Sequence, residues 1–138
     1  MQVKIAKSSG FCRGVKHAVD TAMSIPAENT YILGELIHNP IVTEQVAARG
    51  IRTVETVVEV PSGATLLLRS HGVGKAIYEE CGRRGIRVVD CTCAFVKRIQ
   101  KIVEELSGTD REIVRTGSAR HPEVIGLNGW CGGRAVVI

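Results

Sequence analysis

The alternation of short apolar runs with helix-length segments is the feature that most limits how this chain can fold. Residues 86–97 show it best. A β-branched run ends at Asp90, and apolar side chains then recur at helical spacing from Phe95 to Leu106. The same order of strand, loop and helix is repeated along most of the sequence. Because helix-sized connections between successive strands imply parallel pairing, we predict an α/β fold with a mainly parallel sheet and helices on both faces.

The boundaries of the expected elements follow from periodicity and from glycine and proline. Strands are predicted at residues 3–5, 30–33, 51–54, 65–68, 86–90, 112–115 and 134–138. Helices are predicted at residues 15–22, 40–49, 75–81, 95–106 and from Pro122 onward. We place the domain boundary in the helix 95–106. Residues 1–95 then form a first α/β unit that includes the N-terminal strand and the Cys12 loop, and residues 96–138 form an incomplete second α/β unit.

Composition narrows the class of protein. With 44% hydrophobic and 23% charged residues the chain has the balance of a globular protein. It has no apolar run long enough to span a bilayer, and its first residues lack the apolar core of a signal peptide, so we expect no membrane partner and a cytoplasmic location. The net charge of +4 suits a small anionic ligand, whereas the lack of a basic run and the five aromatic residues argue against nucleic acid.

Candidate functional side chains follow the carboxyl ends of predicted strands, where open α/β sheets bind their ligands. These residues are Cys12, His38, His71, Cys93 and His121. A single Cys or His in such a place is more often a structural or solvated residue than a ligand. Their occurrence at equivalent strand ends favours one shared site.

The thiols and the imidazoles suit different ligands. Thiolates bind soft metals and iron–sulfur clusters, whereas imidazoles donate hydrogen bonds to anions. Cys93 lies at a strand-to-helix turn, where free N–H groups and the helix dipole stabilise a thiolate. Several histidines beside glycine-rich helix N-termini would form a phosphate cradle. Glu123 would place a carboxyl beside that cradle as a proton donor, although stabilising the first turn of its own helix is its simpler role.

The remaining histidine and two further cysteines are assigned structural roles or none. His17 lies inside the helix 15–22 next to Lys16 and is placed on its solvent face. Cys81 precedes a glycine at a helix end and is placed in the core. Cys131 lies in a turn-like, glycine-rich segment, and no role is assigned to it. The odd number of five cysteines, with no sign of export, disfavours a disulfide framework.

Five short motifs, taken together, resemble those of the 4-hydroxy-3-methylbut-2-enyl diphosphate reductase family, also called IspH or LytB. They occupy residues 10–15 (GFCRGV), 37–40 (IHNP), 70–73 (SHGV), 90–93 (DCTC) and 121–126 (HPEVIG). Each motif is weak alone. Their order and separations match those of the family, which makes the set specific.

The resemblance implies a reaction and a division of roles. The reaction is the reductive removal of a hydroxyl to give isopentenyl and dimethylallyl diphosphates, the last step of the non-mevalonate isoprenoid pathway. Cys12 and Cys93 would be two of three thiolate ligands of a 4Fe-4S cluster, and the three strand-end histidines would hold the diphosphate. Glu123 would lie in the proton-delivery path. An electron donor such as ferredoxin or flavodoxin would supply the electrons.

The sequence also departs from the family pattern. Family members are roughly twice as long, with three α/β units around the cluster, so we interpret this chain as a truncated version of such an enzyme. The third cluster cysteine belongs to the absent part, and the isolated chain is expected to be inactive. Cys91 and Ala94 replace an Ala and a Pro of the usual Ala-Thr-Cys-Pro. Cys91 is a poor stand-in ligand, because two thiolates at Cys-x-Cys spacing seldom reach one cubane.

Two alternatives remain open at this point. One is a zinc or dithiol redox module that uses Cys91, Cys93 and a histidine, although zinc sites usually show two closely spaced ligand pairs and this chain has one. The other is a non-catalytic α/β domain that keeps the fold and has lost the chemistry.

Overall fold

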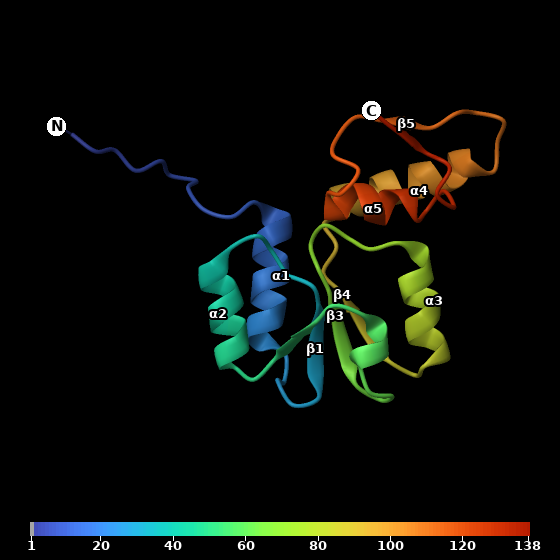
Figure 1. The fold of residues 1–138 in the computed structure, drawn as a ribbon. Helices are drawn as coiled ribbons and strands as arrows, with labels where there is room; N and C mark the ends of the chain where they lie inside the picture. Colours follow the sequence, from blue (N-terminus) through green and yellow to red (C-terminus); the bar gives the residue numbers. More distant parts are fainter. Residues whose placement is uncertain (1) are drawn as a thin grey trace.

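The computed structural model describes residues 2–138 and builds them around two parallel sheets (Figure 1). The larger sheet has the strand order β2-β1-β3-β4. Its strands are β1 (Thr30–Leu33), β2 (Arg52–Val54), β3 (Thr65–Leu68) and β4 (Arg87–Asp90). The smaller sheet pairs β5 (Val114–Arg115) with β6 (Val136–Val137). Every strand pair is parallel, which confirms the predicted α/β class.

Helices fill the crossovers between the strands. They are α1 (Arg13–Ser24), α2 (Pro40–Ala48), the short 3₁₀ helix η1 (Val57–Glu59), α3 (Lys75–Arg83), α4 (Ala94–Ser107) and α5 (Pro122–Asn128). The start of α2 is set by Asn39, whose side chain accepts a hydrogen bond from the backbone N–H of Val42 at 3.2 Å. Its end is followed by Gly50, whose positive φ of 88° suits the left-handed turn into β2.

The larger sheet is covered on both faces. Ile32 and Leu67 pack with α1 and α2 on one face, and Leu66 and Leu68 pack with α3 and η1 on the other. All four residues of the central strand β3 are buried, as its unbroken apolar sequence predicts. In Figure 1, α4 and α5 lie beyond one end of this sheet, where β3 leads into α3. Within residues 2–138, no helix is long and apolar enough to cross a membrane.

The strand predicted at residues 3–5 is wrong. Residues 2–12 form no helix or strand, and they extend away from the body of the molecule (Figure 1). Val3 and Ile5 are 78% and 84% exposed. Alternating apolar side chains form a strand only where a neighbouring backbone offers hydrogen bonds, and neither sheet pairs with this segment. Cys12 therefore precedes α1 as its N-cap instead of following a strand.

The terminal strands are shorter than predicted. β5 and β6 each keep two residues of the longer apolar runs, and each is partly exposed. They pair with each other and not with the larger sheet. The predicted domain boundary at residues 95/96 falls in the first turn of α4, and it stays a prediction.

Candidate functional site

Three histidines from separate loops meet at the carboxyl end of the larger sheet. His38 follows β1, His71 follows β3, and His121 is the N-cap of α5. The ring centroids of His38 and His71 are 4.5 Å apart, and His121 lies 6.2 Å from the first and 6.0 Å from the second. We call these three residues the histidine cluster. The three positions are spread over more than 80 residues of the sequence, and the fold brings them together.

Local contacts orient two of the rings. The Nδ1 of His38 lies 3.1 Å from a carboxylate oxygen of Glu35, so its N–H donates to the carboxylate and Nε2 is left for a ligand. The Nδ1 of His121 accepts the backbone N–H of Glu123 at 3.3 Å, which puts the proton of the neutral ring on Nε2. The neutral ring of His121 can donate its Nε2–H to an anion, whereas His38 can donate from Nε2 only when its ring carries both protons.

His71 is the half-buried member of the histidine cluster. Its Nδ1 is buried and has no hydrogen-bond partner among residues 2–138. Burial lowers the pKa of His71, and the nearby positive charges of His38, Arg69 and His121 lower it further, while Glu123 acts in the opposite direction. A buried polar nitrogen without a partner is costly, and an anionic oxygen would satisfy it.

Ser70 links the loops that carry the candidate residues. Its backbone N–H and its hydroxyl both donate to the carbonyl of Leu36, at 3.2 and 3.3 Å. Its own carbonyl accepts the backbone N–H of Cys93 at 2.9 Å. The loop of His38, the loop of His71 and the start of α4 are therefore bonded side by side. The sequence analysis placed Ser70 in a motif and assigned it no role. No local sequence pattern indicates that this serine is buried.

The two candidate thiols lie at neighbouring helix N-termini. Cys12 is the exposed N-cap of α1 and Cys93 is the half-buried N-cap of α4, and neither side chain makes a capping hydrogen bond. The first turn of α1 touches Cys93 directly, because a Cβ added at Gly14 would lie 2.7 Å from the Sγ of Cys93. A residue with a side chain at position 14 would fill this space.

A hollow of about 370 Å³ opens next to Cys93. It is lined by Arg13, Gly14, His17, Asp90, Thr92, Cys93, Ala94, Phe95 and Lys97. Arg13 and Lys97 lie beside Cys93 in this lining, and two thiols at neighbouring helix N-termini are a donor type that suits an iron–sulfur group. Residues 2–138 include no group of three or more His, Cys, Asp or Glu side chains arranged to hold a metal ion.

The other cysteines face the core. Cys91 is fully buried against α1 and α2, and burial, with the nearby Asp90 carboxylate, raises the pKa of its thiol to about 11. It is therefore a protonated packing residue of the core, which disfavours a zinc or dithiol pair with Cys93. Cys81 is buried as predicted, and Cys131 is buried with its Sγ 3.3 Å from the carbonyl of Asn128. His17 is exposed, as predicted.

Asp90 is a polar centre that sequence reasoning missed. Its carboxylate accepts hydrogen bonds from the hydroxyl of Tyr78 at 3.1 Å and from the backbone N–H of Thr92 at 2.9 Å, and it pairs with Lys97 at 2.8 Å. Burial acts to raise the pKa of Asp90, but the bonds from Lys97 and Thr92 outweigh it and lower the pKa. The network fixes the turn between β4 and α4 that presents Cys93.

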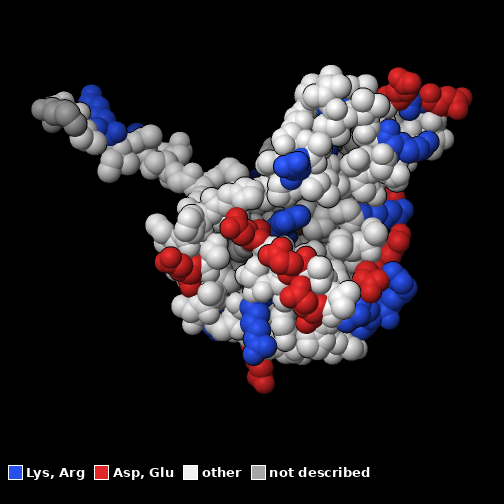
Figure 2. All heavy atoms as spheres, viewed as in Figure 1, with Lys and Arg blue, Asp and Glu red and all other residues white. Residues whose placement is uncertain are grey.

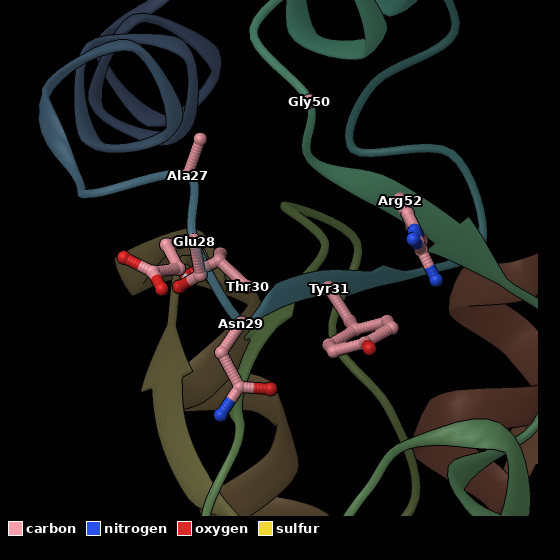
Figure 3. A pocket seen from close by; sticks show the side chains of 7 residues that line it. All are labelled: Ala27, Glu28, Asn29, Thr30, Tyr31, Gly50 and Arg52. Atoms are coloured by element: carbon pink, nitrogen blue, oxygen red, sulfur yellow. Dashed lines mark hydrogen bonds between the residues drawn. The ribbon is translucent and has the colours of Figure 1, made fainter.

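A second hollow, of about 300 Å³, lies at the opposite end of the larger sheet (Figure 3). Its lining consists of Ala27, Glu28, Asn29, Thr30, Tyr31, Gly50 and Arg52, at the amino ends of β1 and β2. Ligands of open α/β sheets bind at the carboxyl ends. No Cys or His lines this hollow, so it is not the candidate site.

One face of the molecule carries charges of both signs side by side. On the face drawn in Figure 2, Lys and Arg side chains lie among Asp and Glu side chains. A polynucleotide site needs a continuous basic surface. This face has no such continuous basic surface. The convergent imidazoles therefore indicate the kind of ligand better than the overall charge does.

Comparison with known proteins gives a consistent result. A family model described as LytB protein matches residues 3–138. The 4-hydroxy-3-methylbut-2-enyl diphosphate reductases of Clostridioides difficile (strain 630) and Alkaliphilus oremlandii (strain OhILAs) are 41% and 42% identical to this chain, over 100% of it and 50% of their own length. The chain therefore spans about half the length of the curated relatives that it matches.

Solved structures agree with the sequence matches. A structure of (E)-4-hydroxy-3-methyl-but-2-enyl diphosphate reductase has a TM-score of 0.81 at 34% identity, over 99% of this chain and 50% of that one. The E-1-hydroxy-2-methyl-but-2-enyl-4-diphosphate reductase from Plasmodium falciparum has a TM-score of 0.87 at 25% identity, over 96% of this chain and 42% of that one. The resemblance drawn from five short motifs is confirmed, as is the fold that it implied.

Proposed function

The chain belongs to the LytB protein family, and from this premise we propose that it binds the diphosphate and part of the iron–sulfur cluster of a 4-hydroxy-3-methylbut-2-enyl diphosphate reductase. The reaction is the reductive dehydroxylation of that substrate to isopentenyl and dimethylallyl diphosphates. The observation that carries the proposal is the histidine cluster, whose ring centroids lie 4.5 to 6.2 Å apart. A diphosphate with several oxygens matches several convergent N–H donors.

The histidine cluster binds and orients the substrate. His38 and His121 present Nε2 outward, and an anion that enters between them gives the buried nitrogen of His71 a partner. A bound anion favours the charged imidazole, so binding raises the pKa of His71 and takes up a proton at mildly acidic pH. Glu123, which follows His121 and acts to raise the pKa of His71, would lie in the proton-delivery path to the leaving hydroxyl.

Cys12 and Cys93 would hold the 4Fe-4S cluster. When bound, the cluster would supply a Lewis-acidic iron and a path for electrons from a donor such as ferredoxin or flavodoxin. Cys12 and Cys93 are the N-caps of α1 and α4, where free backbone N–H groups interact favourably with negative charge. An iron–sulfur cluster needs three or more protein or small-molecule ligands. The ligands beyond Cys12 and Cys93 must therefore come from other groups.

Anaerobic reconstitution with iron, sulfide and an added small thiol tests this proposal. The small thiol supplies the ligands that Cys12 and Cys93 do not. We expect about four irons per chain, a visible absorption band of an iron–sulfur cluster and an EPR signal after reduction. The matched control is the double variant C12A/C93A, which is expected to hold little iron.

The other outcomes would replace the proposal. One zinc per chain without iron would favour the zinc or dithiol module. No metal at all, in a chain that keeps its secondary structure, would favour the non-catalytic domain. Addition of substrate and reductant to the reconstituted chain is expected to give binding without turnover, because the two thiolates leave the cluster incompletely held.

A further inference from the structure

The histidine cluster is shared between two parts of the molecule. His38 and His71 lie on loops of the larger sheet, whereas His121 begins α5, which belongs to the segment that ends in the smaller sheet. No strand pairing joins the two sheets. The geometry of the cluster therefore depends on the contact that holds α5 against the larger sheet, and that contact lies at residues 72–74.

The backbone carbonyl of Val73 is the polar centre of this contact. It accepts the indole N–H of Trp130 at 2.8 Å, and it also accepts the side-chain amide of Gln100 at 3.4 Å. Trp130 follows α5, and Gln100 is a buried polar residue on α4. The Tyr78 ring packs edge-on to Trp130 with centroids 5.8 Å apart, which fixes the indole. One carbonyl thus links β3's loop, α4 and α5.

Glycines let the backbones approach at the same place. A Cβ added at Gly129 would lie 2.7 Å from the Cα of Gly74, and one added at Gly126 would lie 3.2 Å from the carbonyl oxygen of Gly72. Real Cβ atoms essentially never come within 3.0 Å of another heavy atom, so a side chain at position 129 forces the two segments apart, and one at position 126 would be tight. Gly129 has an ordinary helical backbone, with φ of −65° and ψ of −17°. Glycine is therefore needed at position 129 for close packing and not for an unusual backbone conformation.

We propose that Gly129 and Trp130 are positioning residues that set the place of His121 relative to His38 and His71. α5 spans seven residues, or about 10 Å, between this contact and its N-cap His121. Because a helix of this length moves as a rigid unit, a displacement at Gly129 is carried to the imidazole. A misplacement of about 1 Å is enough to weaken a convergent site strongly. The inference is tested by pyrophosphate binding, which rests on the proposed function, and by the contact between the His71 and His121 rings, which does not.

The test compares Gly129→Ala with Gly82→Ala. Gly82 lies in α3, and a Cβ added there meets nothing within 4 Å, so it is a matched glycine-to-alanine control. NMR of the unchanged chain should show nuclear Overhauser effects between the rings of His71 and His121. We expect G129A to lose them and to bind inorganic pyrophosphate about tenfold more weakly, whereas G82A keeps both.

A second variant guards against loss of folding in G129A. Trp130→Phe keeps a ring against Tyr78 and removes the N–H that donates to Val73, so it should weaken the same Overhauser effects and lower pyrophosphate affinity by about two- to fivefold. Unchanged ring contacts in both G129A and W130F would overturn the inference. If the unchanged chain binds no pyrophosphate, the proposed diphosphate role fails, while the ring contacts still decide whether these residues position His121.

Discussion

The histidine cluster and the thiol pair lie near each other at one end of the sheet, yet the chain supports them differently. The histidine rings are oriented by Glu35, by the backbone of α5 and by the bonds of Ser70. The thiols lie at two helix ends without capping bonds, and Cys12 is exposed. The chain's own contacts therefore orient the histidine rings, whereas no capping bond fixes either thiol side chain.

The surroundings of the two sites show the same difference. His71 is half-buried and contacts loops from both parts of the molecule. The thiols are flanked by apolar side chains in solvent, since Phe11 is 48% exposed and Phe95 is 76% exposed. The histidine cluster is thus partly enclosed, whereas the thiols lie beside exposed aromatic rings. Four predictions test this contrast, in order of decreasing effect.

The largest effect is expected from Cys93→Ala. The variant should lose nearly all the iron and the visible absorption of the reconstituted chain, because one remaining thiolate does not hold a cluster. The matched control is Cys91→Ala, which removes a buried, protonated thiol two residues away and should keep the iron. Equal loss of iron in the two variants would contradict the assignment of Cys93 as the ligand.

His71→Ala is expected to weaken pyrophosphate binding about 10- to 100-fold, the value of one charge-assisted hydrogen bond. Calorimetric titration measures it. His17→Ala is the control, because His17 is exposed and lies outside the histidine cluster. A loss of affinity in H17A as large as that in H71A would show that the chain attracts the anion through overall charge and not through the cluster.

Gly14→Ala should destabilise the fold by about 1–3 kcal/mol, because the added methyl group overlaps Cys93. Urea unfolding gives the free energy, and the same preparation gives the iron content, which should also fall. Gly82→Ala, at an open position in a helix, should instead stabilise the fold by up to about 1 kcal/mol. A neutral G14A variant would mean that α1 and Cys93 are not in contact.

The smallest effect concerns pH. The native pKa of His71 is lowered, so the unfolded chain binds this proton more tightly, and stability should fall as the pH drops below about 6.5 and level off below the native pKa. Melting temperatures at about pH 7.5 and about pH 5.5 measure the slope. The melting temperature of the His71→Asn variant should fall less between these two pH values than that of the unchanged chain. The same drop in both proteins would assign the effect to other groups.

Sequence patterns predicted the elements whose signals are local. The apolar run 65–68 gave β3, Asn39 and Pro40 gave the start of α2, and the ordered motifs named the family. The strand at residues 3–5 failed because alternation does not reveal whether a partner strand exists. The three members of the histidine cluster were nevertheless predictable, because each follows a motif or an expected strand end in the sequence.

The residues that join the site were not predictable from local patterns. Gln100 interrupts the apolar positions Val96 and Val103 on the buried face of α4, and this is the only sequence signal that it has a partner. Trp130 and Ser70 act through backbone carbonyls far away in the sequence. Which carbonyl a buried donor meets is decided by tertiary packing, which periodicity and composition do not encode.

The most direct test of the account is a pyrophosphate titration of the unchanged chain, followed through the ring resonances of all four histidines by NMR. The account predicts that His38, His71 and His121 shift together along one binding curve, while His17 stays in place as the internal reference. Shifts confined to one ring, or of equal size at His17, would contradict the claim that the three imidazoles form a single anion site.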